Sequence, residues 1–307
     1  GRTVDDAPGQ PLPARLTISG ADGKHYFARS AAPEGSAVIY DKARSESSVE
    51  RHTTLSAHPF VTDLPSGEYR LTAERGKEYL PAEVQVTVSE EPQEVELRLQ
   101  RFANMADRGW YSGDTHVHRS LAELPNVVLA EDLNVALPLS YWVRTSATPP
   151  ELADQSRPVE ARLITVDPTH VIWPMNTEYE IFSVGGRRHT LGAVFVLNHR
   201  QPLEPPAPPV APIAAAARAE GGLLDLDKHS WPWSIMIVPV MKVDLFELTN
   251  NHVWQTEFAF RQWTFDVHPD GWDIETDAQG WTEWGWIDFG FQTYYALRTS
   301  GYRLRPT

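Results

Sequence analysis

The sequence predicts a two-domain protein, in which an antiparallel β-sandwich over residues 1–101 precedes an α/β domain over residues 102–307. The chain has 307 residues, too many for one ordinary core and suitable for two domains of about 100 to 200 residues each. Hydrophobic residues make up 41% and charged residues 22%, which provides enough apolar surface for folded cores. Near Phe102 the hydrophobic pattern changes from short alternating segments to longer apolar runs, which places the boundary there.

The first domain is predicted from short segments in which apolar and polar residues alternate. They are "ARLTISG", "SAVIYD", "HPFVTDL", "GEYRLTAERG", "AEVQVTV" and "QEVELRLQR", and turn residues such as "ADGK" and "LPSGE" separate them. The stretch "LPSGEYRLTAERGKEYLP" resembles the carboxypeptidase-regulatory or transthyretin-like accessory sandwiches of secreted enzymes. This resemblance implies a structural role, with carbohydrate binding as the alternative. The cellular location stays open, with a secreted or periplasmic one favoured.

The second domain is predicted from apolar runs that end at polar residues. We expect buried strands in "NVVLAEDLNVALPLSYW", "AVFVLNH", "GLLDLDKH" and "MKVDLFELTNNH", and a short helix in "PVAPIAAAARAEGG". Strands that alternate with helices or loops indicate an α/β domain with a mostly parallel sheet. Sites in such domains lie at the carboxyl ends of the strands, so His and Asp residues at strand ends become candidates for a functional site.

Composition limits the kinds of partner and metal site. With 27 basic and 41 acidic residues the formal net charge is −14, which disfavours binding to nucleic acids or to anionic membranes and leaves a small-molecule substrate. The chain has no cysteine, so any metal must be held by His, Asp or Glu. It has no 18-residue apolar run and begins "GRTVDD", so we expect a soluble, processed or trimmed chain. The oligomeric state is left open.

The stretch "RGWYSGDTHVHRS" places Asp114, His116 and His118 at every second position. On a strand these side chains would project from one side, about 7 Å apart per step, so that two imidazoles can reach one cation. A metal site and a hydrogen-bonded structural pair are equally consistent with this pattern alone.

Four motifs in order, "WYSGDTHVHR", "EIFSVGGRRHTLGAVFVLNH", "DLDKHSWPW" and "FELTNNHVW", resemble the polymerase and histidinol phosphatase (PHP) metallohydrolases. They are most similar to the branch that includes carbaryl hydrolase. The resemblance implies a distorted β/α barrel with a cluster of two or three divalent ions. By position it implies metal ligation by the following residues: His116, His118, Glu180, His189 and His229, with His252 less certain because it lies beside the family's usual asparagine position.

Other polar residues near the motifs receive different roles. Glu180 is preferred to Glu178 because the family glutamate directly precedes a β-branched residue, and Glu178 is expected to be solvated. His199 is expected in a loop or beside a ligand. Three residues are candidate catalytic residues: Asp114, which binds metal or orients a ligand histidine, and Arg119 and Lys228, which could contact a phosphate.

The residue types predict metal-dependent hydrolysis. Imidazoles and carboxylates suit Zn, with Mn or Fe as alternatives, and metal-bound hydroxide would cleave an ester, carbamate, amide or phosphoester. Neither a GxSxG elbow nor a P-loop or dinucleotide fingerprint supports another enzyme class. The alternative is a non-catalytic metal-containing protein with a degraded PHP site that binds a glycan or an aromatic ligand.

Two further expectations concern the C-terminal third. PHP enzymes usually close the site with a late Asp-x-His, and we expect none after residue 118. This predicts a barrel incomplete at its C-terminal end and one or two ions per chain. The Trp-rich stretch "WTFDVHPDGWDIETDAQGWTEWGWIDFGF" predicts a packed lid or wall rather than an exposed glycan-binding face, with Trp231 and Trp233 beside the pocket.

Overall fold

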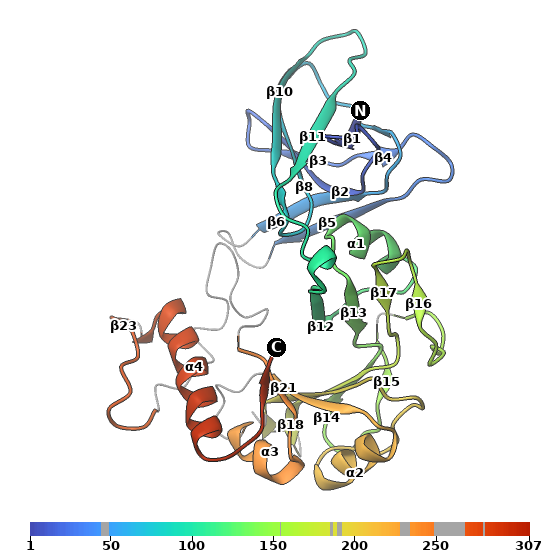
Figure 1. Ribbon diagram of the computed structural model, residues 1–307. Helices are drawn as coiled ribbons and strands as arrows, with labels where there is room; N and C mark the ends of the chain where they lie inside the picture. Colours follow the sequence, from blue (N-terminus) through green and yellow to red (C-terminus); the bar gives the residue numbers. More distant parts are fainter. Residues whose placement is uncertain are drawn as a thin grey trace. The chain divides into compact units, whose positions relative to one another are not determined.

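The computed structural model describes residues 1–43, 49–153, 155–184, 187–188, 192–227, 234–248, 268–278 and 280–307. The chain forms two compact units, and the first contains Gly1–Asp114, Leu121–Ala136 and Thr165–Ile172. The second contains Thr115–Ser120, Leu137–Ile164 and Trp173–Thr307. The described residues are rich in sheets and include four α-helices (Figure 1). The order of the described strands closes no sheet into a barrel.

The first unit is built on a six-stranded antiparallel sheet in the order β10-β8-β2-β6-β5, with β3 paired to β2. Its strands are β2 (Ala14–Gly20), β3 (His25–Tyr26), β5 (Ala37–Ala43), β6 (Val49–Leu55), β8 (Gly67–Glu74) and β10 (Ala82–Val88). A three-stranded sheet has the order β1-β11-β9, and a further pair is β4-β7. Their strands are β1 (Arg2–Asp5), β11 (Glu96–Arg101), β9 (Tyr79–Leu80), β4 (Arg29–Ser30) and β7 (Phe60–Val61), and a short 3-10 helix η1 (Ala106–Arg108) follows.

The two larger sheets of this unit share one hydrophobic core. Leu16 and Ile18 of β2 alternate with half-buried polar residues and pack in one cluster with Leu97 and Leu99 of β11. Because successive side chains on a strand point to opposite faces, this alternation assigns one face of each sheet to the core. The strands expected from the sequence in residues 14–101 are present, and the additional strands are β3, β4, β6 and β9.

Helix α1 (Leu124–Ala130) also belongs to the first unit. The Arg75 guanidinium donates to the carbonyls of Pro13 and Leu129 and pairs with Asp132 at 2.7 Å, so it joins the sandwich to the C-terminal end of α1. The sequence predicted a strand over "NVVLA", and this prediction is wrong because the segment is part of helix α1. Pro125 in the first turn is favourable for starting a helix, and this preference prevails over the β-branched valines.

The second unit contains an eight-stranded sheet in the order β15-β14-β18-β20-β21-β22-β25, with β19 paired to β18. Its strands are β14 (Tyr141–Thr145), β15 (Glu151–Leu152), β18 (Thr177–Val184), β19 (Arg187–Arg188), β20 (Ala193–Leu197), β21 (Leu223–Asp227), β22 (Leu245–Phe246) and β25 (Arg305–Pro306). The expected mostly parallel sheet is a mixed one, since β20 is antiparallel to both neighbours. The connection from β18 to β20 is too short for a parallel crossover.

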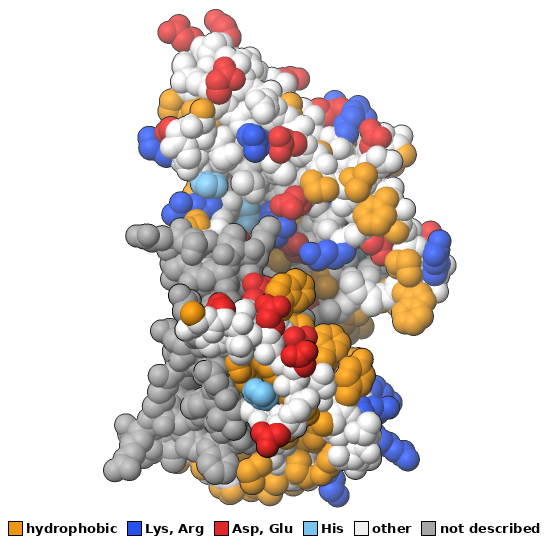
Figure 2. Space-filling view, turned by 90° about the vertical axis from the view of Figure 1, so that its left-hand side faces the viewer, with side chains coloured by type: hydrophobic (Ala, Val, Ile, Leu, Met, Phe, Trp, Pro, Cys, Tyr) orange, Lys and Arg blue, Asp and Glu red, His pale blue; other side chains and the backbone are white. Residues whose placement is uncertain are grey.

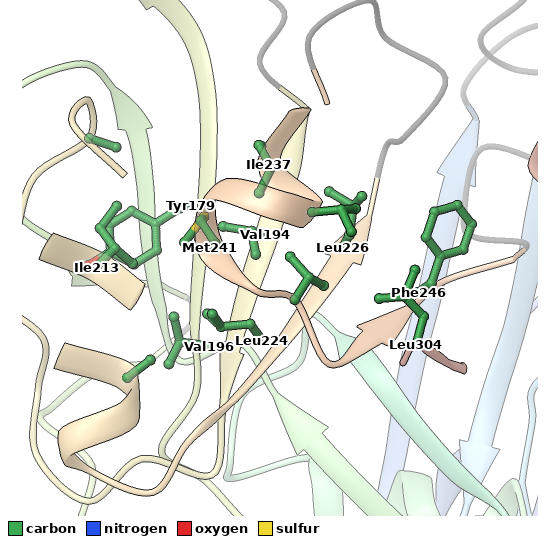
Figure 3. Packing of buried hydrophobic residues seen from close by; sticks show 14 of the residues in the cluster. Tyr179, Val194, Val196, Ile213, Leu224, Leu226, Ile237, Met241, Phe246 and Leu304 are labelled. Atoms are coloured by element: carbon green, nitrogen blue, oxygen red, sulfur yellow. The ribbon is translucent and has the colours of Figure 1, made fainter. Parts of the chain in front are cut away.

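Helices cover one face of this sheet. They are α2 (Ala211–Ala219), α3 (Ser234–Met241) and α4 (Glu283–Thr299). Figure 3 shows Ile213 of α2 and Ile237 of α3 in the same cluster as Val194, Leu224 and Leu226 of the sheet. Residues at alternate positions of β18, β20 and β21 face this core, which leaves the other face of the sheet for different side chains.

The remaining strands are short. They are β12 (Gly113–Val117), β13 (Val135–Pro138), β17 (Val171–Ile172) and β16 (Ile164–Thr165), which form one sheet in that order, and the pair β23 (Thr276–Asp277) and β24 (Gly280–Trp281). Among the described residues no helix is long and apolar enough to span a membrane.

The Trp-rich region is packed in part. Trp281 and Trp286 are fully buried in one cluster with Phe289, which confirms packing for these residues. Trp284 of α4 is 66% exposed. Figure 2 views the side on which α4 lies in Figure 1 and shows hydrophobic and acidic side chains interspersed. Trp231 and Trp233 lie outside the described residues.

Candidate metal centre

The face of the eight-stranded sheet opposite the helices carries a row of acidic residues. The register pairs Glu178 of β18 with Phe195 of β20, and Phe195 with Asp225 of β21. The next row pairs Glu180 with Ala193, and Ala193 with Asp227. Paired residues on neighbouring strands project from the same face, so all four carboxylates lie on one side of the sheet.

Glu247 extends this acidic face on the neighbouring strand. It follows β22 directly, two positions after Leu245, which pairs with Asp225. Asp227 is the last residue of β21, so both acids stand at carboxyl ends of strands that run in the same direction. Apolar side chains on the same face form a small cluster beneath them that includes Phe195 and Leu245.

Two histidines of the HxH motif meet these carboxylates. His116 Nδ1 lies 3.4 Å from Glu247 Oε1 and 3.8 Å from Asp227 Oδ2. His118 Nε2 lies 3.2 Å from Glu178 Oε2. His116 lies within strand β12, which ends at Val117, and His118 is the first residue after the strand. The motif therefore contributes two imidazoles to one acidic face.

The five side chains form two overlapping groups that could hold a metal ion. One group is His116, His118 and Glu178, the other is His116, Asp227 and Glu247, and the ligand atoms within each group lie within 4.8 Å of one another. His116 belongs to both groups. A single substitution of this residue therefore removes a ligand from each group.

The centre is buried on one side and open on the other. Glu178 and Asp227 are 0% exposed, whereas the His118 side chain is 27% exposed. The His116 ring packs edge-on against Phe195 at 4.6 Å between centroids, and the His118 ring lies 5.0 Å from Trp142. These contacts restrict both imidazoles and place the accessible side at His118 and Trp142.

Burial also changes the acidity of a neighbouring carboxyl. Burial, with repulsion from Asp227, raises the pKa of Asp225 to about 7, although the hydroxyl of Thr307 donates to Asp225 Oδ1 at 3.1 Å. Fully buried carboxylates are costly unless a cation or hydrogen bonds compensate for their charge. A divalent ion fits this face because it would supply such a charge.

The donor set indicates which ions suit the centre. It offers imidazole nitrogens and carboxylate oxygens, and two imidazoles with one carboxylate form a ligand set of catalytic zinc sites. The same combination suits ferrous iron and manganese. The buried His, Glu and Asp groups are thus able to hold a metal, and their chemistry leaves the choice among these ions open.

The structure brings together only part of the ligand set expected from the sequence. His116 and His118 are together, and Glu180 is buried on the same face, in the row next to Glu178. Asp114 is exposed and lies in neither group, and the Arg119 carbonyl accepts from Gln155 Nε2 at 3.2 Å. Four expected site residues lie outside the described residues: His189, Lys228, His229 and His252.

Two expectations about carboxylates were wrong. Glu178, expected to be solvated, is fully buried and next to His118. The absence of an Asp-x-His after residue 118 was also wrong, because Asp227-Lys228-His229 and Asp266-Val267-His268 have this pattern. Asp227 belongs to the cluster and was missed. The signal was present, since Asp227 ends the apolar run "LLDLD".

Two other buried histidines have structural partners. His199 is 0% exposed; its Nδ1 donates to the Gln201 carbonyl at 2.7 Å, and its Nε2 accepts from the Thr177 hydroxyl at 3.0 Å. Burial lowers the pKa of His199. His170 belongs to an ion-pair network of the first unit, with Nδ1 2.8 Å from Asp167.

Comparison of the chain with models of protein families, with curated proteins and with solved structures gave no match.

Proposed function

We propose that the second unit is a metal-dependent hydrolase of the PHP type. The five residues of the cluster hold one or two divalent ions, with zinc foremost and manganese or iron as alternatives: His116, His118, Glu178, Asp227 and Glu247. The observation that carries the proposal is that His116 is shared by two groups of ligand type whose carboxylates are buried. His189, His229 and His252, which the resemblance implies as ligands, remain predictions beside this set.

The arrangement of layers supports the proposal. Helices pack on one face of the eight-stranded sheet, and the polar cluster lies on the other, with Asp227 and Glu247 at carboxyl ends of strands. α/β barrel enzymes use this division, with a helical outer layer and catalytic residues at the carboxyl ends of the strands. A distorted, incompletely closed barrel is part of the proposal.

The residues around the centre suit hydrolysis. His116, His118, Glu178, Asp227 and Glu247 would hold the divalent ion, which would supply an activated water and a Lewis acid for hydrolysis. Glu178 and Asp227 compensate the positive charge from the buried side, and Phe195 excludes water from one edge of His116. His118 is the more exposed ligand, so the substrate approaches from its side.

The substrate is a small molecule with an ester, carbamate, amide or phosphoester bond. Carbonyl and phosphoryl attack need the same activated water, so the ligand set does not separate them. Arg119, directly after His118, and Lys228, directly after Asp227, are the cations that support a phosphoester substrate.

Metal analysis combined with a panel of chromogenic esters, carbamates and phosphoesters tests the proposal. We expect zinc-loaded protein to hydrolyse at least one class, and we expect a chelator to abolish the reaction. The His116→Ala variant should lose both metal and activity, because its imidazole serves both groups. His58→Ala is the matched control, since His58 lies in the first unit beside Ser56.

Turnover that survives complete removal of metal would contradict the proposal. Bound metal without turnover on any substrate would favour the alternative, a binding protein in which the centre has a structural role.

A further inference from the structure

A cavity of about 350 Å³ has among its lining residues Trp142, which contacts His118 of the candidate centre. It is lined by residues of β14, β15 and the turn between them, including Trp142, Arg144, Thr148, Glu151 and Leu152. Trp142 is also the residue whose ring contacts His118, at 5.0 Å between centroids. The cavity and the centre therefore have Trp142 as a common neighbour.

The Trp142 side chain relates the cation of this cavity to the centre, because the pairing of β14 with β18 shifts register between Val143 and Thr145. Trp142 pairs with Glu178, so its side chain projects from the same face as the acidic cluster. Arg144 is two positions later on β14, and its guanidinium carbon lies 4.8 Å from the centre of the Trp142 ring. A guanidinium over the face of an indole ring is attracted by the ring electrons. Trp142 thus links Arg144 to His118.

We propose that this cavity binds an anionic group of the substrate and that Arg144 is its specificity-determining residue; this inference rests on the proposed function of the adjacent centre. Arg144 is exposed, and within the described part of the chain its side chain forms no ion pair. A planar guanidinium with free donors matches the geometry of a carboxylate or a phosphate.

The charge distribution gives this arginine its selectivity. The chain carries a formal charge of −14, and several carboxylates lie on the face of the centre, so the surroundings repel anions. An anionic substrate therefore needs a local cation to bind near the ion. Among the described residues that line this cavity, Arg144 is the cation.

Distance sets the size of the substrate. The guanidinium carbon and the His118 ring lie 4.8 and 5.0 Å from the same Trp142 ring, so they are at most about 10 Å apart. A substrate whose anionic group contacts Arg144 and whose reactive bond lies at His118 would therefore span about 10 Å or less. The substrate class is a small ester, amide or phosphoester with a nearby carboxylate or phosphate.

Glu151 supports the opposite interpretation of the cavity, in which the bound group is cationic. It pairs with Trp142 on β15 and is exposed, so it could instead attract a cationic group. If the group is anionic, substitution of Arg144 should weaken binding, and if it is cationic, substitution of Glu151 should do so. The comparison between Arg144 and Glu151 therefore decides the sign of the ligand.

Isothermal titration of zinc-loaded protein with benzoate, phenyl phosphate, neutral benzamide and cationic benzamidine tests the proposal. Arg144→Gln should weaken binding of at least one anion by about tenfold or more, a typical loss for one charge-assisted contact, and should change benzamide binding less than about twofold. The anion that loses more identifies the group as carboxylate or phosphate. Arg144→Lys should recover part of the affinity.

The control is Arg200→Gln, which removes an exposed arginine that follows the end of β20, and it should leave all four affinities unchanged. Direct binding of the anion to zinc contributes equally to the affinities of the wild type and of Arg144→Gln, so the difference between these affinities reports the contribution of Arg144. The proposal is overturned if wild type binds neither anion, if Arg144→Gln affects benzamide as much as the anions, or if benzamidine binds and only Glu151→Gln abolishes its binding. Anion binding that depends on Arg144 without any hydrolysis would reject the proposed function alone.

Discussion

Replacing Asp132 by Asn should destabilise the first unit strongly, because this carboxylate is the centre of a buried ion-pair network. The Asp132 side chain is 7% exposed, pairs with Arg75 at 2.7 Å and also accepts from Arg101. His170 Nε2 lies 3.6 Å from the same carboxylate. Burial opposes ionisation, but the hydrogen bond to His170 and the two arginines outweigh it and lower the pKa of Asp132.

The expected loss is about 3 kcal/mol. Breaking a buried ion pair from one side costs about 3 to 5 kcal/mol because the remaining charge is left without compensation. Arg75 is as buried as Asp132, whereas Arg101 is 26% exposed and can be hydrated, which places the loss at the lower end. Residue 132 has φ of +49°, a conformation that Asn tolerates, so this substitution isolates the electrostatic effect.

Guanidinium denaturation at neutral pH, followed by circular dichroism, measures the loss. Asp132→Ala should be worse by about 1 kcal/mol, since alanine disfavours the left-handed backbone. Asp63→Asn is the control: its ion pair with Arg29 is exposed, and removing it should cost less than about 1 kcal/mol. Equal midpoints for Asp132→Asn and Asp63→Asn would refute this account of the network.

Three further predictions concern stability. Burial opposes protonation of His170, but hydrogen bonds to Asp132 and Asp167 outweigh burial and raise the pKa of His170 above 6.5, so its stabilisation is complete below pH 6.5 and is lost as pH rises through the folded pKa. In urea titrations the wild type should therefore exceed His170→Asn in stability by more at about pH 6 than at about pH 9. A stability difference that does not change with pH would contradict this prediction. Phe246→Ala empties a fully buried position and should cost about 3 to 5 kcal/mol, against less than about 1 kcal/mol for Val240→Ala, which is 55% exposed. Gly285→Ala would place a Cβ too close to the carbonyl oxygen of Glu275 and should lower the melting temperature. An unchanged or higher melting temperature would show that the backbone at Glu275 can move away without loss of stability.

Sequence patterns predicted the elements in which burial and hydrophobicity coincide. Leu16 and Ile18 alternate with polar residues, which is why β2 could be placed from the sequence. Strand β6 was missed because its buried positions include Thr53 and Thr54, which do not form a visible hydrophobic alternation. Helix α1 has a strand-like sequence because two adjacent β-branched valines lie in its short apolar run.

The candidate site was predictable only where its residues are close in the sequence. His116 and His118 lie two positions apart, so the strand period alone placed them together. Glu178 and Asp227 come together through pairing of β18, β20 and β21, and this register depends on distant partners. Choosing between Glu178 and Glu180 could not be settled by a neighbouring β-branched residue, because both lie on the same face.

The number of zinc ions retained per chain after gel filtration, measured by elemental analysis, tests the central claim most directly. We expect one or two ions in the wild type and in the His58→Ala control. Glu178→Gln and Glu247→Gln each remove a ligand from one group and should lower the zinc content or affinity, whereas His116→Ala removes a ligand from both groups and should retain less than about a tenth of the zinc. A wild type that binds no divalent metal, or a His116→Ala variant with unchanged zinc content, would contradict the account.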